Sequence, residues 1–304
     1  MVRKHTRRAA KAAYAISLAV AIVIGLIAAG AGTAASTAKP TVTIGTKNFT
    51  EQYVLGQLYK QALEAKGYKV AYKENIGSSE LIDTALNAGK INFYPEYDGV
   101  IVTDLAKQAF PKSANATYLA ALKWEETRGN TVLKPTPFYD SDGFVVLTST
   151  AKKLGVTTIA DMKKVKSFSY AGYPECRTRI TCLLGLKNIY GLKHVKFVPL
   201  ASISVYTLLD KGKITGGDGF STDPPLQGTQ YTVLKDTKHI FGFQNVVPVL
   251  TKALAGDAKL VDIVNSVSAK LTIPAMIAMN KAVAVDKKSP ADVADAFLKA
   301  NHLK

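Results

Sequence analysis

Alternation between β-rich runs and helical stretches constrains the fold of this chain more than any other feature of its sequence. It begins at residue 41 and continues through five segments of alternating type: 41–45, 50–67, 69–74, 79–89 and 91–97. The second and fourth segments carry apolar residues at helical spacing and end at glycines, whereas the other three are short and β-rich. A β-α-β-α-β series with short connections predicts a mostly parallel sheet covered by helices.

The middle of the chain repeats this pattern. Further strands are expected at 143–149, 167–172, 195–200 and 231–236, and helices at 157–165, 180–192 and 203–213. The tail from Ala258 onward is helical in two or three pieces, and Ser289-Pro290 opens the last of them. Two α/β units and a helical tail predict a bilobed α/β protein. In such sheets, ligands bind beyond the carboxyl ends of the strands.

The first 38 residues differ in kind from the rest. A basic start is followed by an apolar run without a charge, from Ala12 to Ser36, and then by small residues. This three-part order is typical of a secretory signal peptide, and the run is also long enough for an uncleaved membrane anchor. We therefore expect an exported, extracytoplasmic protein, at the cell surface or in a periplasm. No cysteine follows the run, which excludes lipid attachment there.

The chain is basic, with a formal charge of +16. Removing the five basic residues of 1–38 lowers this to about +11. The lysines are scattered and form no dense block, so we expect no nucleic-acid partner. The charge fits solubility, or attraction to an anionic cell surface.

Cys176 and Cys182 are the only cysteines, and five residues separate them. In an exported chain this spacing predicts a local disulfide, with a stabilisation of about 2 kcal/mol for so short a loop. The rival interpretation is a metal site. It is disfavoured because the nearest histidine in the sequence is His194.

Enzyme signatures are missing from the sequence. It contains no G-x-S-x-G, Walker A, H-E-x-x-H or G-x-G-x-x-G motif, and we expect neither catalysis nor a cofactor. Two basic loops instead precede helices: Lys47 lies in GTKNFTEQ, and Arg177 and Arg179 lie in GYPECRTRIT. Such loops suit the binding of a carboxylate.

Aromatic residues lie at several expected strand ends and links: Tyr97, Tyr139, Phe144, Tyr173, Phe220 and Phe243. With Asp142 close by, a group of them would suit a cation that has no N–H donors. Such a cation cannot be held by hydrogen bonds, so ring faces and a carboxylate must hold it.

Together, these motifs resemble a known family. The segments IGTKNFTEQYVLGQLYKQALEAKGYKV, NIGSSELIDTALNAGKINFYPEYDG, GFSTDPPL and YTVLKDTKHIFGFQNVVPVL resemble the ProX/OpuAC-type osmoprotectant-binding proteins of ABC transporters, the receptors for glycine betaine, choline and carnitine. The resemblance covers nearly all of residues 41–304. It implies a two-lobed periplasmic-binding-protein fold of type II, in which each lobe is a mixed, mainly parallel sheet flanked by helices. It also implies a monomer that delivers its ligand to a membrane permease.

The resemblance carries site residues over position by position. It implies ligand contacts at Lys47, Gln52, Tyr97, Asp142, Phe144, Arg179, Phe220 and Phe243. Three tyrosines of the family's aromatic box become phenylalanines here, and Val100 stands where a threonine is often found. Since Lys47 and Arg179 are both kept, the resemblance favours a carboxylate-bearing ligand, betaine or carnitine, over choline. Which osmoprotectant binds stays open.

We expect the chain to cross between lobes twice. The first lobe would comprise residues 41–143 and 245–304, and the second residues 144–244. One alternative is a receptor of this shape for another solute, such as an amino acid or a polyamine; a polyamine needs several acids lining the cleft, and the candidate loops supply few. Another is an enzyme on this fold, for which Asp142 is the sole candidate base. A third is a sensor domain fused to a membrane partner.

Overall fold

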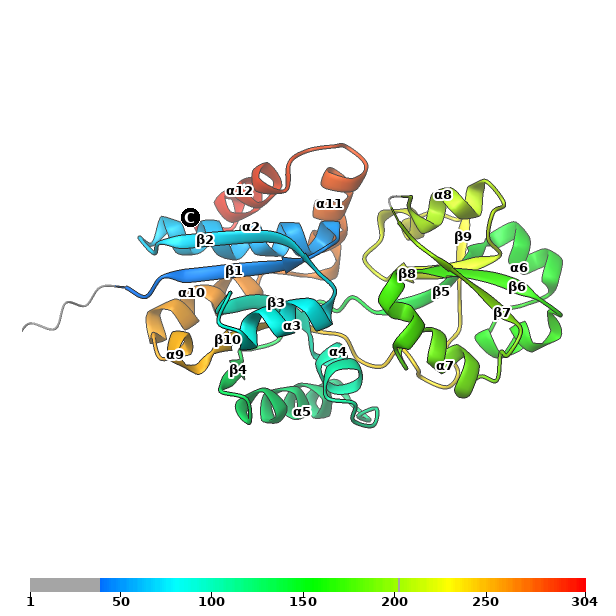
Figure 1. Cartoon of the computed structure of the whole chain (residues 1–304). Helices are drawn as coiled ribbons and strands as arrows, with labels where there is room; N and C mark the ends of the chain where they lie inside the picture. The colour runs from blue at the N-terminus through cyan, green and yellow to red at the C-terminus, as the bar shows by residue number, and fades with distance from the viewer. Residues whose placement is uncertain (1–38, 202) are drawn as a thin grey trace, which may run out of the picture. The chain divides into compact units, whose positions relative to one another are not determined.

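A computed structural model describes residues 39–201 and 203–304, and in this range the chain forms two five-stranded sheets (Figure 1). The sheet of the first lobe has the order β2-β1-β3-β10-β4. Its strands are β1 (Val42–Lys47), β2 (Val70–Gly77), β3 (Phe93–Tyr97), β4 (Asn130–Val132) and β10 (Val246–Thr251). Strands β2, β1 and β3 pair in parallel, and β10 runs antiparallel between β3 and β4.

The sheet of the second lobe repeats this topology in the order β7-β6-β8-β5-β9. Its strands are β5 (Asp142–Leu147), β6 (Phe168–Gly172), β7 (Val195–Pro199), β8 (Gly216–Phe220) and β9 (Tyr231–Leu234). Here β5 is the reversed strand, antiparallel to β8 and β9. Two mixed, mainly parallel sheets of equal order confirm the predicted fold class.

Helices cover both sheets. The first lobe carries α2 (Thr50–Ala65), α3 (Ser79–Asn87), α4 (Asp98–Val100) continued by a π-helical turn (Ile101–Leu105), α5 (Ala114–Glu126), α9 (Lys252–Ala255), α10 (Ala258–Ser268), α11 (Ile273–Ala284) and α12 (Pro290–Ala300). The second carries α6 (Thr148–Leu154), α7 (Leu183–Asn188), α8 (Val205–Asp210) and the 3₁₀ helices Ile159–Lys164, Pro174–Thr178 and Pro224–Gln227. The helices predicted for 157–165 and 180–192 are therefore shorter than expected.

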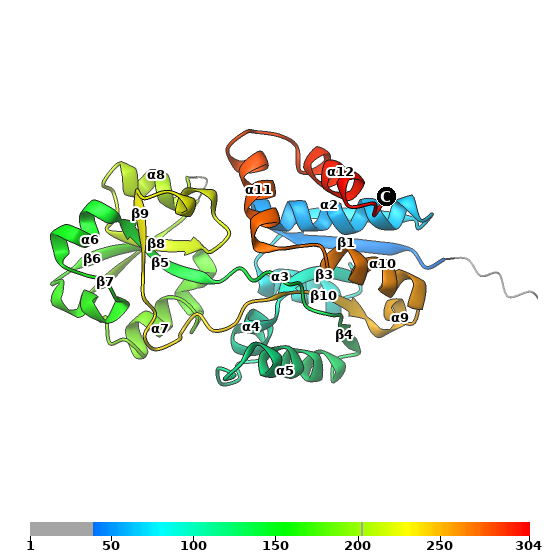
Figure 2. The same cartoon turned by 180° about the vertical axis from the view of Figure 1, so that it is seen from behind.

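The C-terminal helices return to the first lobe. Leu260 of α10, Met276 of α11 and Leu298 of α12 are fully buried in one apolar cluster with Leu55 and Leu58 of α2. The views in Figures 1 and 2 agree that these helices lie beside α2. Burial of this apolar stripe fixes the first strand–helix unit, and with it the loop that carries Lys47.

Two extended segments, 133–141 and 235–245, join the lobes (Figure 2). Tyr139 and Asn245 pair in an isolated antiparallel bridge, so the two crossings run side by side. Asp142 and Gly143, which the sequence analysis placed in the first lobe, are the first residues of β5 in the second sheet.

Strand β8 (Gly216–Phe220) was not predicted from the sequence because it is rich in glycine. Its sequence GGDGF offers few β-branched or aromatic side chains. A Cβ atom at Gly216 would lie 2.3 Å from the ring of Phe144, so the phenylalanine of β5 fills the space that the glycine leaves. The ring of Phe144 therefore belongs to the core of the second lobe.

The predicted signal peptide or anchor at 1–38 lies outside the described residues. Within them, no single helix has the length and apolarity that a membrane span needs. Helices α10 and α11 meet those criteria only as a pair, with a bend of 84° between them.

Candidate functional site

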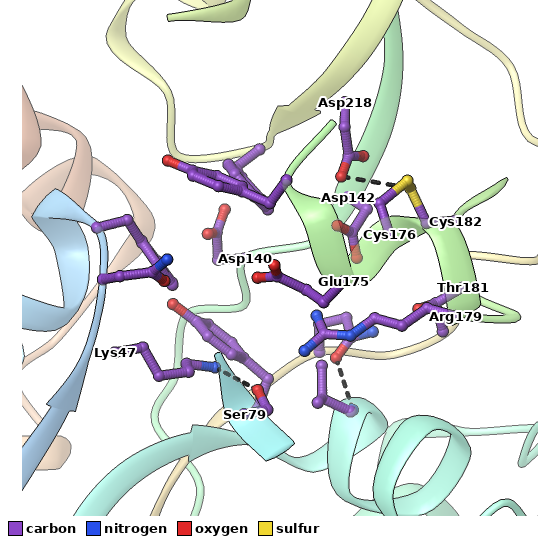
Figure 3. Close-up of a pocket in the computed structure, with 17 residues that line it drawn as sticks. Lys47, Ser79, Asp140, Asp142, Glu175, Cys176, Arg179, Thr181, Cys182 and Asp218 are labelled. Atoms are coloured by element: carbon purple, nitrogen blue, oxygen red, sulfur yellow. Dashed lines mark hydrogen bonds between the residues drawn. A yellow bond between two sulfur atoms is a disulfide. The ribbon is translucent and has the colours of Figure 1, made fainter. Parts of the chain in front are cut away.

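A cavity lies between the two sheets and is lined by both lobes (Figure 3). Strand β1 and α3 contribute Lys47 and Ser79, and the segment after β6 contributes Glu175 and Arg179. The lining combines three chemical classes: four aromatic rings, four carboxyl groups and two basic side chains. Both lobes must therefore come together to build this site.

The four aromatic rings form a continuous row across the cavity. Phe49 stacks on Tyr97 with ring centroids 6.3 Å apart and on Phe220 with centroids 5.8 Å apart. Phe220 in turn stacks on Tyr173 at 6.3 Å. Tyr97 and Phe49 belong to the first lobe, and Phe220 and Tyr173 to the second. The row thus gives the cavity an apolar, aromatic wall, the kind of surface that attracts an alkylated cation.

Lys47 is buried at the end of β1 and already has polar partners. Its ammonium group forms an ion pair with Glu96 of β3, donates to Ser79 Oγ at 3.2 Å, and lies 4.2 Å from the centroid of the Tyr97 ring. Burial lowers the pKa of Lys47, although the Glu96 carboxylate opposes that shift. Lys47 thus reaches the cavity as one half of a neutralised pair.

Arg179 is the second basic group, and it too has an acidic partner. Its Nε and Nη2 donate to the two carboxylate oxygens of Glu80 on α3, at 3.1 and 3.0 Å. Burial alone would raise the pKa of Glu80, but the hydrogen bonds and charge of Arg179 lower it to about 2. Since Arg179 belongs to the second lobe, this bidentate pair joins the lobes across the cavity.

Four carboxyl groups line the cavity: Asp140, Asp142, Glu175 and Asp218. Burial raises the pKa of Asp142 to about 7, with Asp104 adding to the shift and Arg179 opposing it. The pKa of Asp218 lies well above its usual value because of burial and repulsion from Asp142. Burial raises that of Asp140 in the same way. Three carboxyl groups of the lining, those of Asp140, Asp142 and Asp218, therefore have raised pKa values, and a bound cation would favour their ionised form.

The predicted disulfide is confirmed: Cys176 and Cys182 are bonded to each other. The bond closes the loop that carries Arg179 and packs in the core of the second lobe. Asp218 Oδ2 lies 3.5 Å from Cys182 Sγ (Figure 3). A disulfide sulfur has no proton to donate, so this contact suits a protonated Asp218. Bonded sulfurs offer no thiolate, so the clustering of these three residues does not constitute a metal site.

A second polar connection between the lobes lies beside the aromatic row, where the cleft widens. Glu51 of α2 is buried and accepts three hydrogen bonds: from the Tyr97 hydroxyl at 2.7 Å, from Thr222 Oγ1 at 2.6 Å and from Asn280 Nδ2 at 3.0 Å. Thr222 belongs to the second lobe and the other three residues to the first. Burial raises the pKa of Glu51, and the three donors oppose that shift.

The structure brings five of the eight predicted contact residues together around the cavity: Lys47, Tyr97, Asp142, Arg179 and Phe220. The other three predicted contact residues do not line this cavity. Gln52 is fully buried, and its Oε1 accepts the backbone N–H of Lys47 at 3.4 Å. Phe144 packs against Phe168 and Tyr170 in the core. Phe243 is 40% exposed on a crossing segment, and its neighbour Gln244 lines the cavity instead.

The prediction also missed residues that line the cavity. Phe49 lies inside the KNFTEQ motif and could have been found from its place between Lys47 and the helix. Tyr173 was among the aromatic residues noted at strand ends but not among the eight predicted contacts, and Asp140 lies two residues before the predicted Asp142. Asp218 had no usable signal because the glycine-rich strand β8 was not recognised.

Other residues of the YPEYDG motif serve the fold. Tyr94 is fully buried in a second apolar cluster of the first lobe. Asp98 accepts the backbone N–H of Asn245 at 2.9 Å, so it ties the end of β3 to the second crossing. Burial raises its pKa to about 7.

Comparison with known proteins places this geometry in context. Residues 40–300 match the family model "Substrate binding domain of ABC-type glycine betaine transport system". A glycine-betaine-binding protein of Pseudomonas aeruginosa is 29% identical over 92% of this chain and 92% of its own length. A carnitine transport binding protein of Listeria monocytogenes is 26% identical over 87% of this chain and 88% of its own length. A solved structure described as a glycine betaine/carnitine/choline ABC transporter is 26% identical, with a TM-score of 0.68 over 86% of this chain and 99% of that chain. The chain belongs to the family of substrate-binding domains of ABC-type glycine betaine transport systems.

Proposed function

We propose that this protein captures a small quaternary ammonium osmoprotectant outside the cytoplasm and delivers it to an ABC importer. The observation that carries the proposal is the row of four rings, Tyr97, Phe49, Phe220 and Tyr173, at a cavity that also holds carboxyl groups. Alkylated nitrogen has no N–H to donate. Ring faces and carboxylates attract its charge without hydrogen bonds.

The proposed ligand contacts come from both lobes. Tyr97 and Phe49 of the first lobe and Phe220 and Tyr173 of the second supply the rings, and Asp142 supplies a carboxyl group at the start of β5. A ligand between them favours the closed arrangement of the lobes because only that arrangement completes its contacts. The closed form would then dock on the permease as a monomer. No step of this cycle requires catalysis.

Isothermal titration of the purified protein with glycine betaine, proline betaine, carnitine and choline tests the proposal, with glutamate as the control. We expect a dissociation constant of about 1 μM or lower for at least one of the four quaternary amines, the range typical of a specific small-ligand site. Absence of heat for all four would overturn the proposal.

A second candidate solute is a polyamine. The sequence offered few acids for one, but the structure places four carboxyl groups at the cavity. A polyamine carries N–H donors that need acceptors, which those carboxyls supply. Adding spermidine to the titration separates the two: binding of spermidine without binding of any quaternary amine would favour the second candidate.

A further inference from the structure

Both basic side chains at the cavity are neutralised by acids of the first lobe. Lys47 pairs with Glu96, whose side chain is fully buried, and Arg179 pairs in bidentate fashion with Glu80. Neither Glu96 nor Glu80 lines the cavity. The two pairs therefore supply the cavity with no net positive charge, although the sequence suggested two cations ready for a ligand carboxylate.

The remaining charged groups of the lining are all acidic. Lys47 and Arg179 form their ion pairs with Glu96 and Glu80, and not with the lining acids Asp140, Asp142, Glu175 and Asp218. Asp142 and Asp218 come from adjacent strands, β5 and β8, and a negative charge on Asp142 raises the pKa of Asp218. A single positive charge beside them would favour the ionised form of both carboxyl groups. A negative charge brought into the cavity would have the opposite effect.

From this charge balance we propose that the cavity selects a monocationic quaternary amine that carries no carboxylate, with choline as the probe, over a zwitterionic betaine. This inference rests on the proposed function and narrows its substrate class. A betaine carboxylate must compete with Glu96 for Lys47 or with Glu80 for Arg179, and a successful competitor leaves an unpaired carboxylate beside the cavity. Choline has a hydroxyl in place of the carboxylate and leaves both pairs intact.

Titration calorimetry on the purified protein with choline chloride and with glycine betaine tests the inference. We expect choline to bind at least tenfold more tightly. A smaller ratio, or tighter binding of glycine betaine, would overturn the inference while leaving the proposed function in place. No binding of any quaternary amine would overturn the proposed function itself.

A matched pair of variants on α3 assigns the selectivity to the pair with Arg179. Glu80→Gln frees Arg179 for a ligand carboxylate and should lower the choline-to-betaine affinity ratio at least fivefold. The ratio is the correct readout, because any loss of lobe closure weakens both ligands equally. Asp83→Asn is the control: Asp83 lies one turn further on α3 and accepts from Arg128 Nη2 with both oxygens at 2.7 Å, away from the cavity. It should leave the ratio unchanged. An unaltered ratio in Glu80→Gln, or an equal change in Asp83→Asn, would refute the role of Glu80.

Discussion

The hydrogen bond from Thr222 to Glu51 offers a direct way to weaken lobe closure without touching a ligand contact. Thr222→Val keeps the shape of the side chain and removes its hydroxyl, which donates to Glu51 at 2.6 Å across the lobes. Glu51 keeps the donors Tyr97 and Asn280, which are in its own lobe. The backbone N–H of Thr222 still donates to Asp140. The Thr222 hydroxyl also accepts from Asn280 Nδ2 at 3.2 Å, so the substitution removes two hydrogen bonds between the lobes. The contact of Asn280 Nδ2 with the backbone oxygen of Thr222, at 3.4 Å, is kept.

The expected magnitude follows from the type of bond. A bond to a neutral partner contributes about 0.5–1.5 kcal/mol and one to a charged partner about 1.5–3. The pKa of Glu51 is raised by burial, so we take about 1.5 kcal/mol, where the two ranges meet. The bond exists only when the lobes are together, so its loss destabilises the closed state and leaves the open state unchanged. The dissociation constant should rise about 12-fold, since each 1.4 kcal/mol is a factor of ten.

Titration calorimetry with the tightest-binding quaternary amine measures this change. Thr117→Val is the control, because the buried hydroxyl of Thr117 donates to Ser113 within the first lobe. It should lower stability and leave affinity within about twofold, as expected for a site remote from closure. If Thr222→Val binds as tightly as the unaltered protein, closure does not depend on the Glu51 connection and the reasoning fails.

Three further predictions concern the rings, the carboxyl groups and the disulfide. Tyr97→Ala should weaken quaternary-amine binding more than tenfold, or about 1.4 kcal/mol. Tyr97→Phe keeps the aromatic ring, and its dissociation constant should stay within about threefold of that of the unaltered protein. Equal losses of affinity for the two variants in calorimetry would assign the role of Tyr97 to its hydroxyl and not to its ring. A bound cation favours the ionised form of Asp142, whose pKa is about 7 when the cavity is empty, so binding should release protons and tighten from pH 6 to pH 8. Titrations in buffers of different ionisation enthalpy check this, and proton uptake would contradict it. Replacing both Cys176 and Cys182 by serine should lower the free energy of unfolding by about 2 kcal/mol, measured by urea denaturation; no loss would mean that the closed loop is equally ordered without the bond.

Much of the fold followed from local patterns in the sequence. The unit that runs from β1 to β3 was placed to within a few residues, because its apolar residues recur at helical or strand spacing. Strand β8 was missed because glycines replace β-forming side chains where Phe144 and Val145 fill the space on its two faces. That compensation comes from a strand some 70 residues away in the chain, and no local pattern reveals it.

Site residues that belong to a sequence motif could be predicted, whereas their partners elsewhere in the chain could not. Lys47, Tyr97 and Arg179, for which the resemblance implies ligand contacts, line the cavity. Their acidic partners could not be foreseen, since Glu96 is 49 residues from Lys47 and Glu80 is 99 residues from Arg179. In the sequence, Lys47 and Arg179 look like groups that bind a ligand carboxylate. In the structure each is neutralised by an acid, so the acidic side chains of the lining dominate the charge of the cavity.

The central claim is that ring faces and carboxyl groups recognise the positive charge of an alkylated nitrogen. Titration with choline and with 3,3-dimethylbutan-1-ol, its neutral isostere, tests this most directly because the two differ only in the charged atom. We expect the neutral alcohol to bind at least 100-fold more weakly, a difference of about 2.7 kcal/mol. Binding of the two within threefold of each other would show that the cavity recognises shape and apolar surface alone, and would contradict the account.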